Sequence, residues 1–153
     1  MPNAEAEVIA RGQDAAAGAA SVAAASGAVI DKALRAMAGL LTDRAPAILA
    51  ANAADVAAGQ EAGLGAGLLD RLRLDSGRIT EMARQVGLLA DAPFPPEQTP
   101  FRDLPGGLQL TERRIPVGVI GANFEARPNV TIDVASQLLK DRKSTRLNSS
   151  HRR

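Results

Sequence analysis

The sequence predicts an α/β protein in which a helical block precedes strands and a final strand–loop–helix unit. Apolar side chains recur at helical spacing through most of the segment 1–92. Residues 93–107 hold five of the nine prolines, which disfavour both helix interiors and central strands. A short apolar run at 117–121 then precedes a second helical pattern. The strand–loop–helix unit that ends this series is expected to be the beginning of an α/β fold.

The first 56 residues predict three helices. Residues 4–25 are almost all helix formers, mainly alanine, and predict a long helix that breaks near Ser26-Gly27. Pro46 suits the first turn of the third helix, and Asn52 is expected to cap a continuation of that helix. The second helix is amphipathic, because its apolar residues recur at spacings of four, three and four: Ile30, Leu34, Met37 and Leu41.

Four glycines between residues 59 and 67 punctuate the chain, and a short helix is expected around residues 68–72. No Lys-Ser or Lys-Thr follows these glycines at the required spacing, so a phosphate-binding loop is excluded. Asp75 or Ser76 is expected to cap the next helix, which ends before Pro93. That helix has four apolar residues on one face: Ile79, Met82, Val86 and Leu89.

The proline-rich residues 93–107 are expected to form a link, and the pattern changes after them. An extended strand is predicted across residues 108–115, and residues 117–121 (VGVIG) predict a buried strand. A helix is expected to start at Asn129 or Thr131. Gly118 and Gly121 lack the three spaced glycines of a dinucleotide-binding fingerprint.

Composition and charge exclude several classes of function. The chain has no cysteine, so it can form no disulfide, thiolate metal site or thiol nucleophile. Residues 141–153 carry five basic residues against one acid, whereas residues 1–140 carry 13 against 16. The body therefore offers no basic surface for nucleic acid. No apolar stretch reaches the ~20 residues of a membrane span, and Glu5 and Glu7 argue against a signal peptide.

Two segments resemble the γ-glutamyl phosphate reductases, a branch of the aldehyde dehydrogenase superfamily. The first is ILAANAAD at residues 48–55, continuing to LDRL at residues 69–72. The second is PVGVIG at residues 116–121, followed by EARPNVTID at residues 125–133. The resemblance covers most of residues 28–140. It implies an incomplete aldehyde dehydrogenase-like fold, with residues 1–92 as the N-terminal helical segment of the cofactor-binding domain, 93–107 as a link and 108–140 as the start of the α/β portion.

The resemblance also implies an activity. Members of the family reduce L-glutamyl 5-phosphate to glutamate 5-semialdehyde and phosphate with NADPH, in proline biosynthesis. A cysteine thiolate attacks the acyl phosphate and hydride reduces the resulting thioester. The parent protein is expected to be a cytoplasmic homo-oligomer that acts on this small molecule, without a nucleic-acid, membrane or metal partner.

This sequence departs from the family in two ways. It lacks the nucleophilic cysteine, so the chain itself is expected to be inactive. After Lys140 the family continues into a Gly-Asn-containing turn and another buried strand, whereas residues 141–153 are polar and without periodicity. We interpret residues 141–153 as a non-native, disordered tail that resembles translated vector sequence joined to a shortened reading frame.

The resemblance points to two site residues. Asn129 is the candidate donor to the oxyanion that develops at the reacting carbonyl, a role that can lower a barrier by about 3 kcal/mol. The alternative is that Asn129 caps the following helix. Arg127 is the candidate for binding the phosphate or carboxylate of the substrate. The alternative is an ion pair between Arg127 and either Glu125 or Asp133.

A second class of function is an alanine-rich helical interaction module without catalysis. It predicts that residues 1–92 fold cooperatively alone and present an apolar face to a partner. It leaves the run at residues 125–131 without an explanation, so the reductase interpretation is favoured.

Overall fold

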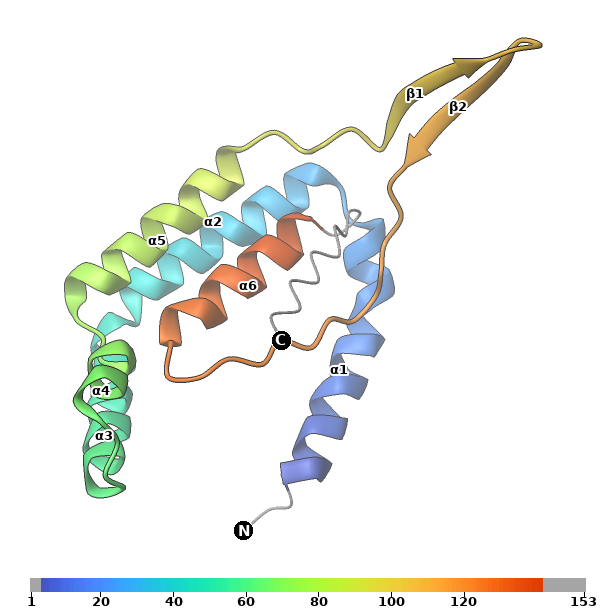
Figure 1. Cartoon of the computed structure of the whole chain (residues 1–153). Helices are drawn as coiled ribbons and strands as arrows, with labels where there is room; N and C mark the ends of the chain where they lie inside the picture. Colours follow the sequence, from blue (N-terminus) through green and yellow to red (C-terminus); the bar gives the residue numbers. More distant parts are fainter. Residues whose placement is uncertain (1–3, 142–153) are drawn as a thin grey trace. The chain divides into compact units, whose positions relative to one another are not determined.

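The computed structural model describes residues 4–141, which form six helices and one two-stranded sheet (Figure 1). The chain divides into two compact units. Of the described residues, the first unit contains 4–25, 93–121 and 141, and the second contains 26–92 and 122–140. The α/β class predicted from the sequence is confirmed.

The first unit contains α1 (Ala4–Ala24) and a β-hairpin of β1 (Gln98–Leu104) and β2 (Leu108–Arg113). The helix predicted for residues 4–25 is thus confirmed. The hairpin is antiparallel, with Gln98 opposite Arg113 and Leu104 opposite Leu108. Gly106 and Gly107 in its turn both have positive φ, which glycine adopts without steric cost.

Residues 93–107, predicted as a proline-rich link, contain the strand β1, which was not predicted from the sequence. Pro100 is tolerated there for a physical reason. Both strands of a two-stranded hairpin are edge strands, so a missing N–H need not break a central ladder. The regular register also breaks between Pro100 and Arg102.

The buried strand predicted at residues 117–121 is not formed either. This segment has no regular structure, Val119 is 47% exposed and Gly118 has a φ of +97°. An apolar strand of this kind is buried when neighbouring strands satisfy its backbone groups on both edges. Within residues 4–141, the only strands are β1 and β2, which pair with each other.

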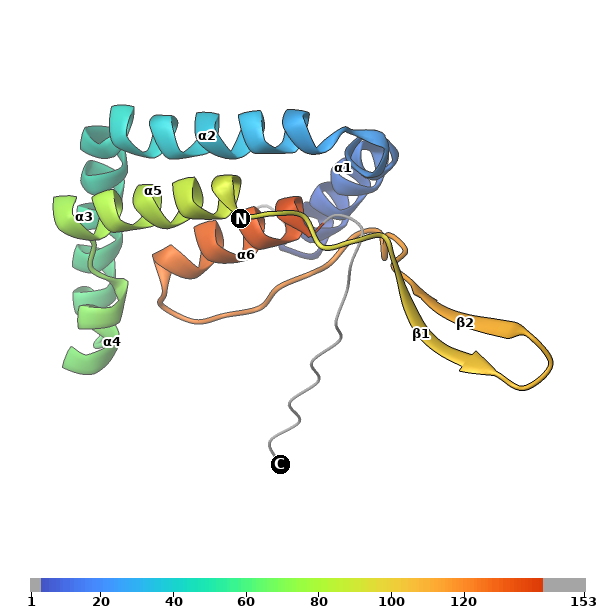
Figure 2. The same cartoon turned by 90° about the horizontal axis from the view of Figure 1, so that it is seen from above.

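The second unit is built on α2 (Gly27–Asp43) and α5 (Ser76–Asp91), which lie alongside each other (Figures 1 and 2). Helix α6 (Pro128–Lys140) packs against both, and α3 (Ala45–Glu61) and α4 (Ala66–Leu72) pack together at one end of the pair. Pro46 lies in the first turn of α3, as predicted.

The core lies mainly between α2 and α5 and includes six residues that the helical periodicity placed on one face of these helices; Ala90 of α5 and Val56 of α3 are also buried. Met37 and Leu89, also assigned to these faces, are half-buried. Full burial of one aliphatic side chain stabilises a fold by roughly 1.5–3 kcal/mol. The six residues are Ile30, Leu34, Leu41, Ile79, Met82 and Val86.

Side-chain caps fix where α2 and α5 begin. Ser26 accepts a hydrogen bond from the Val29 N–H, and Asp75 accepts one from the Arg78 N–H at 2.7 Å. Both helix starts agree with the sequence-based expectation. Each such cap is worth about 1 kcal/mol.

Asn52 does not cap a helix, so this prediction was wrong. It lies in the middle of α3 and is only 6% exposed. Its amide nitrogen donates to the Leu72 carbonyl at 2.8 Å, and its oxygen accepts from the Leu74 N–H at 2.7 Å. Because α3 has no interruption at this point, the side chain is available to hold the extended link between α4 and α5.

Lys140 ties the end of α6 to the other two core helices. Its ammonium lies 2.7 Å from a carboxylate oxygen of Asp31 on α2 and donates to the Ala90 carbonyl on α5 at 3.1 Å. Lys140 is 5% exposed, so the contact is shielded from solvent. This contact fixes the position of α6 on α2 and α5.

None of the helices in residues 4–141 has the length and apolarity needed to cross a membrane. Apart from Asp141, the predicted non-native tail lies outside the described residues.

Candidate functional site

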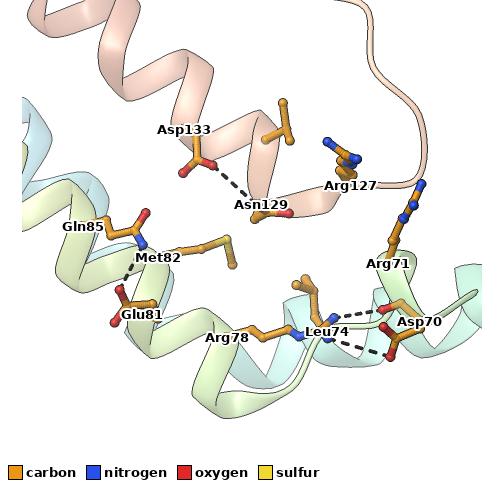
Figure 3. Close-up of a pocket in the computed structure, with 11 residues that line it drawn as sticks. Asp70, Arg71, Leu74, Arg78, Glu81, Met82, Gln85, Arg127, Asn129 and Asp133 are labelled. Carbon is orange, nitrogen blue, oxygen red and sulfur yellow. Dashed lines mark hydrogen bonds and ion pairs between the residues drawn. The ribbon is translucent and has the colours of Figure 1, made fainter. Parts of the chain in front are cut away.

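An open pocket of about 670 Å³ lies on the second unit, between α5 and the start of α6 (Figure 3). Three segments supply its walls: the end of α4 with the link that follows, one face of α5, and the loop before α6 with the first two turns of that helix. The lining residues are Asp70, Arg71, Leu74, Arg78, Glu81, Met82, Gln85, Arg127, Asn129, Val130 and Asp133.

Helix α5 presents Arg78, Glu81, Met82 and Gln85 to the pocket because residues three and four apart lie on one helical face. Met82 is 5% exposed and joins this wall to the core. Arg78 donates from one terminal nitrogen to the carbonyls of Asp70, at 2.9 Å, and of Arg73. Arg78 thereby satisfies carbonyls at the end of α4 that the short helix leaves open.

Glu81 is a fixed anion rather than a proton acceptor. The Arg84 guanidinium contacts both of its carboxylate oxygens, at 2.6 and 2.7 Å, and Gln85 donates to it at 2.9 Å. These hydrogen bonds, chiefly those from Arg84, lower the pKa of Glu81 to about 2. Its charge is therefore already compensated at neutral pH.

Asn129 lies in the first turn of α6, inside the helix rather than at its cap position. The capping alternative is therefore not what the structure shows. Its amide nitrogen lies 3.4 Å from a carboxylate oxygen of Asp133, one turn further along α6. Figure 3 shows the two side chains on the pocket side of the helix. An amide has two N–H donors, so the contact with Asp133 orients Asn129 and leaves a second donor.

Arg127 lines the pocket and is exposed. Within residues 4–141, Arg127 forms no ion pair. The alternative predicted for it, an ion pair with Glu125 or Asp133, is therefore not observed. The residue before it, Ala126, has a φ of +47°, the one positive φ outside glycine in the described chain. Such a backbone conformation is costly for alanine and commonly occurs where a loop holds a functional residue.

The structure thus brings Asn129 and Arg127 to one pocket, and the roles predicted for them remain predictions. Sequence reasoning missed the pocket residues contributed by α4 and α5. A signal for Arg71 was present, because it lies in the LDRL run at residues 69–72 that contributed to the family resemblance. The face of α5 gave no such signal, because its pocket residues follow the same periodicity as any solvated helix face.

The described residues hold neither a metal site nor a dinucleotide cradle. No group of three or more His, Asp or Glu side chains in residues 4–141 is arranged to hold a metal ion. Residues 117–121, which follow β2, are irregular and exposed, and they lack the glycine spacing that binds a pyrophosphate. No residue in this part of the chain is therefore assigned to the nicotinamide cofactor.

Known proteins with similar sequences include γ-glutamyl phosphate reductases, each matched over part of its length. No family model matches the sequence. The γ-glutamyl phosphate reductase of Deinococcus radiodurans is 50% identical over 109 residues, which are 71% of this chain and 25% of the relative. That of Moorella thermoacetica is 50% identical over 111 residues, covering 72% and 27% of the two chains. The chain is homologous to part of the γ-glutamyl phosphate reductases.

The fold agrees with the sequence relationship. The crystal structure of γ-glutamyl phosphate reductase from Thermotoga maritima superposes with a TM-score of 0.78 and 30% identity, covering 88% of this chain and 33% of the other. The chain therefore spans about a quarter to a third of the reductases that it matches. The resemblance inferred from residues 48–72 and 116–133 is confirmed.

Proposed function

We propose that this chain forms one wall of the substrate site of an NADP-dependent γ-glutamyl phosphate reductase. That enzyme reduces L-glutamyl 5-phosphate to glutamate 5-semialdehyde and phosphate in proline biosynthesis. The observation that supports the proposal is that Arg127 and Asn129, from the run at residues 125–131, both line a pocket in a fold similar to that of these reductases.

Each residue has a role that its chemistry fits. The Arg127 guanidinium is a two-pronged donor suited to phosphate or carboxylate oxygens. The Asn129 amide donates to the oxygen that becomes negatively charged as the acyl phosphate is attacked. Asp133 holds that amide at 3.4 Å, which limits its rotation before substrate arrives. The attacking thiolate comes from outside this sequence, because these 153 residues contain no cysteine.

The proposal extends to the whole reductase. Residues 1–92 and 108–140 belong to its cofactor-binding domain, joined by residues 93–107, and NADPH is the hydride donor. The active enzyme is a cytoplasmic homo-oligomer. The chain alone is inactive, because a thioester requires a sulfur nucleophile that it does not contain.

A chimera tests the proposal. Residues 28–140 replace the homologous segment of the Deinococcus radiodurans reductase, and NADP-dependent, phosphate-dependent oxidation of glutamate 5-semialdehyde is measured. We expect kcat/KM within about tenfold of the intact relative, since the two sequences are 50% identical over the 109 residues that match. A matched graft of residues 28–124 alone retains the relative's own loop and α6.

Two outcomes contradict the proposal. One is a folded 28–140 chimera that has the oligomeric state of the relative and no turnover. The other is activity only in the 28–124 graft, which would show that the segment carrying Arg127 and Asn129 is not equivalent to that of the reductases.

The alternative of a helical interaction module fits the structure poorly. It requires residues 1–92 to be self-contained, whereas α6 packs against α2 and α5. The buried contact between Lys140 and Asp31 also joins the two sequence segments.

A further inference from the structure

Two arginines from distant parts of the sequence line the same pocket. Arg71 lies in the last turn of α4, and Arg127 lies in the loop directly before α6. Figure 3 shows both at the end of the pocket away from Glu81 and Gln85, with the Arg71 side chain extending from α4 towards the loop that carries Arg127. Both residues are exposed.

These two guanidiniums differ from those of Arg78 and Arg84. Arg78 is engaged by two carbonyls and by Asp70, and Arg84 is engaged by Glu81. Arg71 and Arg127, in contrast, form no ion pair or side-chain hydrogen bond within the described residues 4–141.

No acid of the pocket forms an ion pair with Arg71 or Arg127 within residues 4–141. Asp70 lies 3.9 Å from Arg78, Glu81 is bound by Arg84, and Asp133 accepts from Asn129. The pocket therefore has one end with two guanidiniums that form no ion pair among the described residues, an arrangement suited to a multiply charged anion.

We propose that Arg71 acts with Arg127 as a second guanidinium that binds the phosphoryl group of the acyl phosphate. The inference rests on the proposed function. The phosphoryl group is favoured over the α-carboxylate because Arg127 is two residues from Asn129, and the phosphoryl oxygen is attached to the carbonyl that Asn129 would polarise. Two planar guanidiniums can each contact two phosphate oxygens.

This assignment gives Arg71 a part in the chemistry. When the thiolate sulfur bonds to the carbonyl carbon, the bond between that carbon and the phosphate oxygen breaks, and phosphate leaves with the electron pair. The charge on the leaving group is then greatest, and two guanidiniums stabilise it more than one does. Arg71 is thus a binding residue for the leaving group.

The 153-residue chain itself allows the test, because phosphate binding requires neither cysteine nor cofactor. The probe is inorganic phosphate, titrated while the Nε–Hε signals of the arginines are followed by NMR, with L-glutamate as a second ligand that has carboxylates only. We expect the signals of Arg71 and Arg127 to shift together and to respond more strongly to phosphate than to glutamate. Arg71→Gln and Arg127→Gln should each weaken phosphate binding about tenfold or more, the effect of one charge-assisted contact.

Arg73→Gln is the matched control, because Arg73 is also exposed, lies two residues from Arg71 and does not line the pocket. It should change affinity less than about twofold, and Arg71→Lys should bind with intermediate affinity. If Arg127→Gln weakens binding and Arg71→Gln does not, the role of Arg71 is refuted and the proposed site stands. If the chain binds no phosphate, the role of Arg71 and the proposed phosphate site are both refuted. Equal losses of phosphate affinity in Arg71→Gln and Arg73→Gln would show that the effect comes from net charge alone. They would refute a specific role for Arg71 in phosphate binding.

Discussion

Replacing Asn52 with alanine tests the contact that holds the α4–α5 link against α3. The substitution removes two hydrogen bonds, of 2.7 and 2.8 Å, and leaves the Leu74 N–H and the Leu72 carbonyl without their partner. An unsatisfied buried group costs about 1–3 kcal/mol, and these two are partly buried, so the combined loss is about 2–4 kcal/mol. Alanine is the better helix former by about 0.6 kcal/mol, which leaves a net destabilisation of about 1.4–3.4 kcal/mol.

Urea denaturation followed by circular dichroism measures this change, and hydrogen exchange at the Leu74 amide reports the contact directly. Gln60→Ala is the control, because Gln60 is an exposed amide on the same helix and should change the free energy of unfolding by less than about 0.5 kcal/mol. An Asn52→Ala variant that unfolds at the same urea concentration as the control, with Leu74 still protected, would refute this reasoning.

Two further predictions concern glycines and pH. Gly39→Ala should stabilise the chain by about 0.5–1 kcal/mol, since a Cβ there meets nothing within 4 Å. Gly59→Ala should destabilise it by about 1 kcal/mol, since a Cβ there would lie 2.9 Å from the Leu64 side chain. Urea midpoints that move in the same direction for Gly39→Ala and Gly59→Ala would contradict these two predictions. The Glu81 carboxyl should titrate in NMR with a pKa of about 2, chiefly because of its hydrogen bonds with Arg84. These hydrogen bonds stabilise the fold fully above the ordinary pKa of 4.5, and this stabilisation is lost as the pH falls through about 2. A measured pKa near 4.5 would show that the contact with Arg84 does not persist in solution.

The helices were predictable from the sequence because their signals are local. Apolar spacing identified the faces of α2 and α5 that form the core, and Ser26 and Asp75 marked the starts of these helices. Such signals depend on residues within one or two turns, which is the range over which caps and periodicity act.

The failures involve partners distant in sequence. Residues 117–121 have the composition of a buried strand, but no neighbouring strand lies beside them in the described part of the chain. Asn52 was assigned to a cap by its residue type, whereas its partners, Leu72 and Leu74, lie 20 and 22 residues away. A side chain that serves a distant backbone segment has no local pattern that identifies it.

The part of the candidate site that lies in one local segment was predictable, whereas the part contributed by distant segments was not. Arg127 and Asn129 lie in one continuous run, so the family resemblance identified both. The pocket that they share with α4 and α5 exists only because α6 packs against α5. Arg71 became a candidate once the structure showed that it lines this pocket and has no acidic partner among the described residues.

The proposed function assigns the acyl-phosphate site of a γ-glutamyl phosphate reductase to the pocket between α5 and the start of α6. The most direct test is the turnover of the 28–140 chimera with Asn129→Ala, compared with the unsubstituted chimera. Removing an oxyanion donor should lower kcat by about 100-fold or more while the oligomer and its thermal unfolding are unchanged. Turnover within about threefold of the unsubstituted chimera would contradict this assignment.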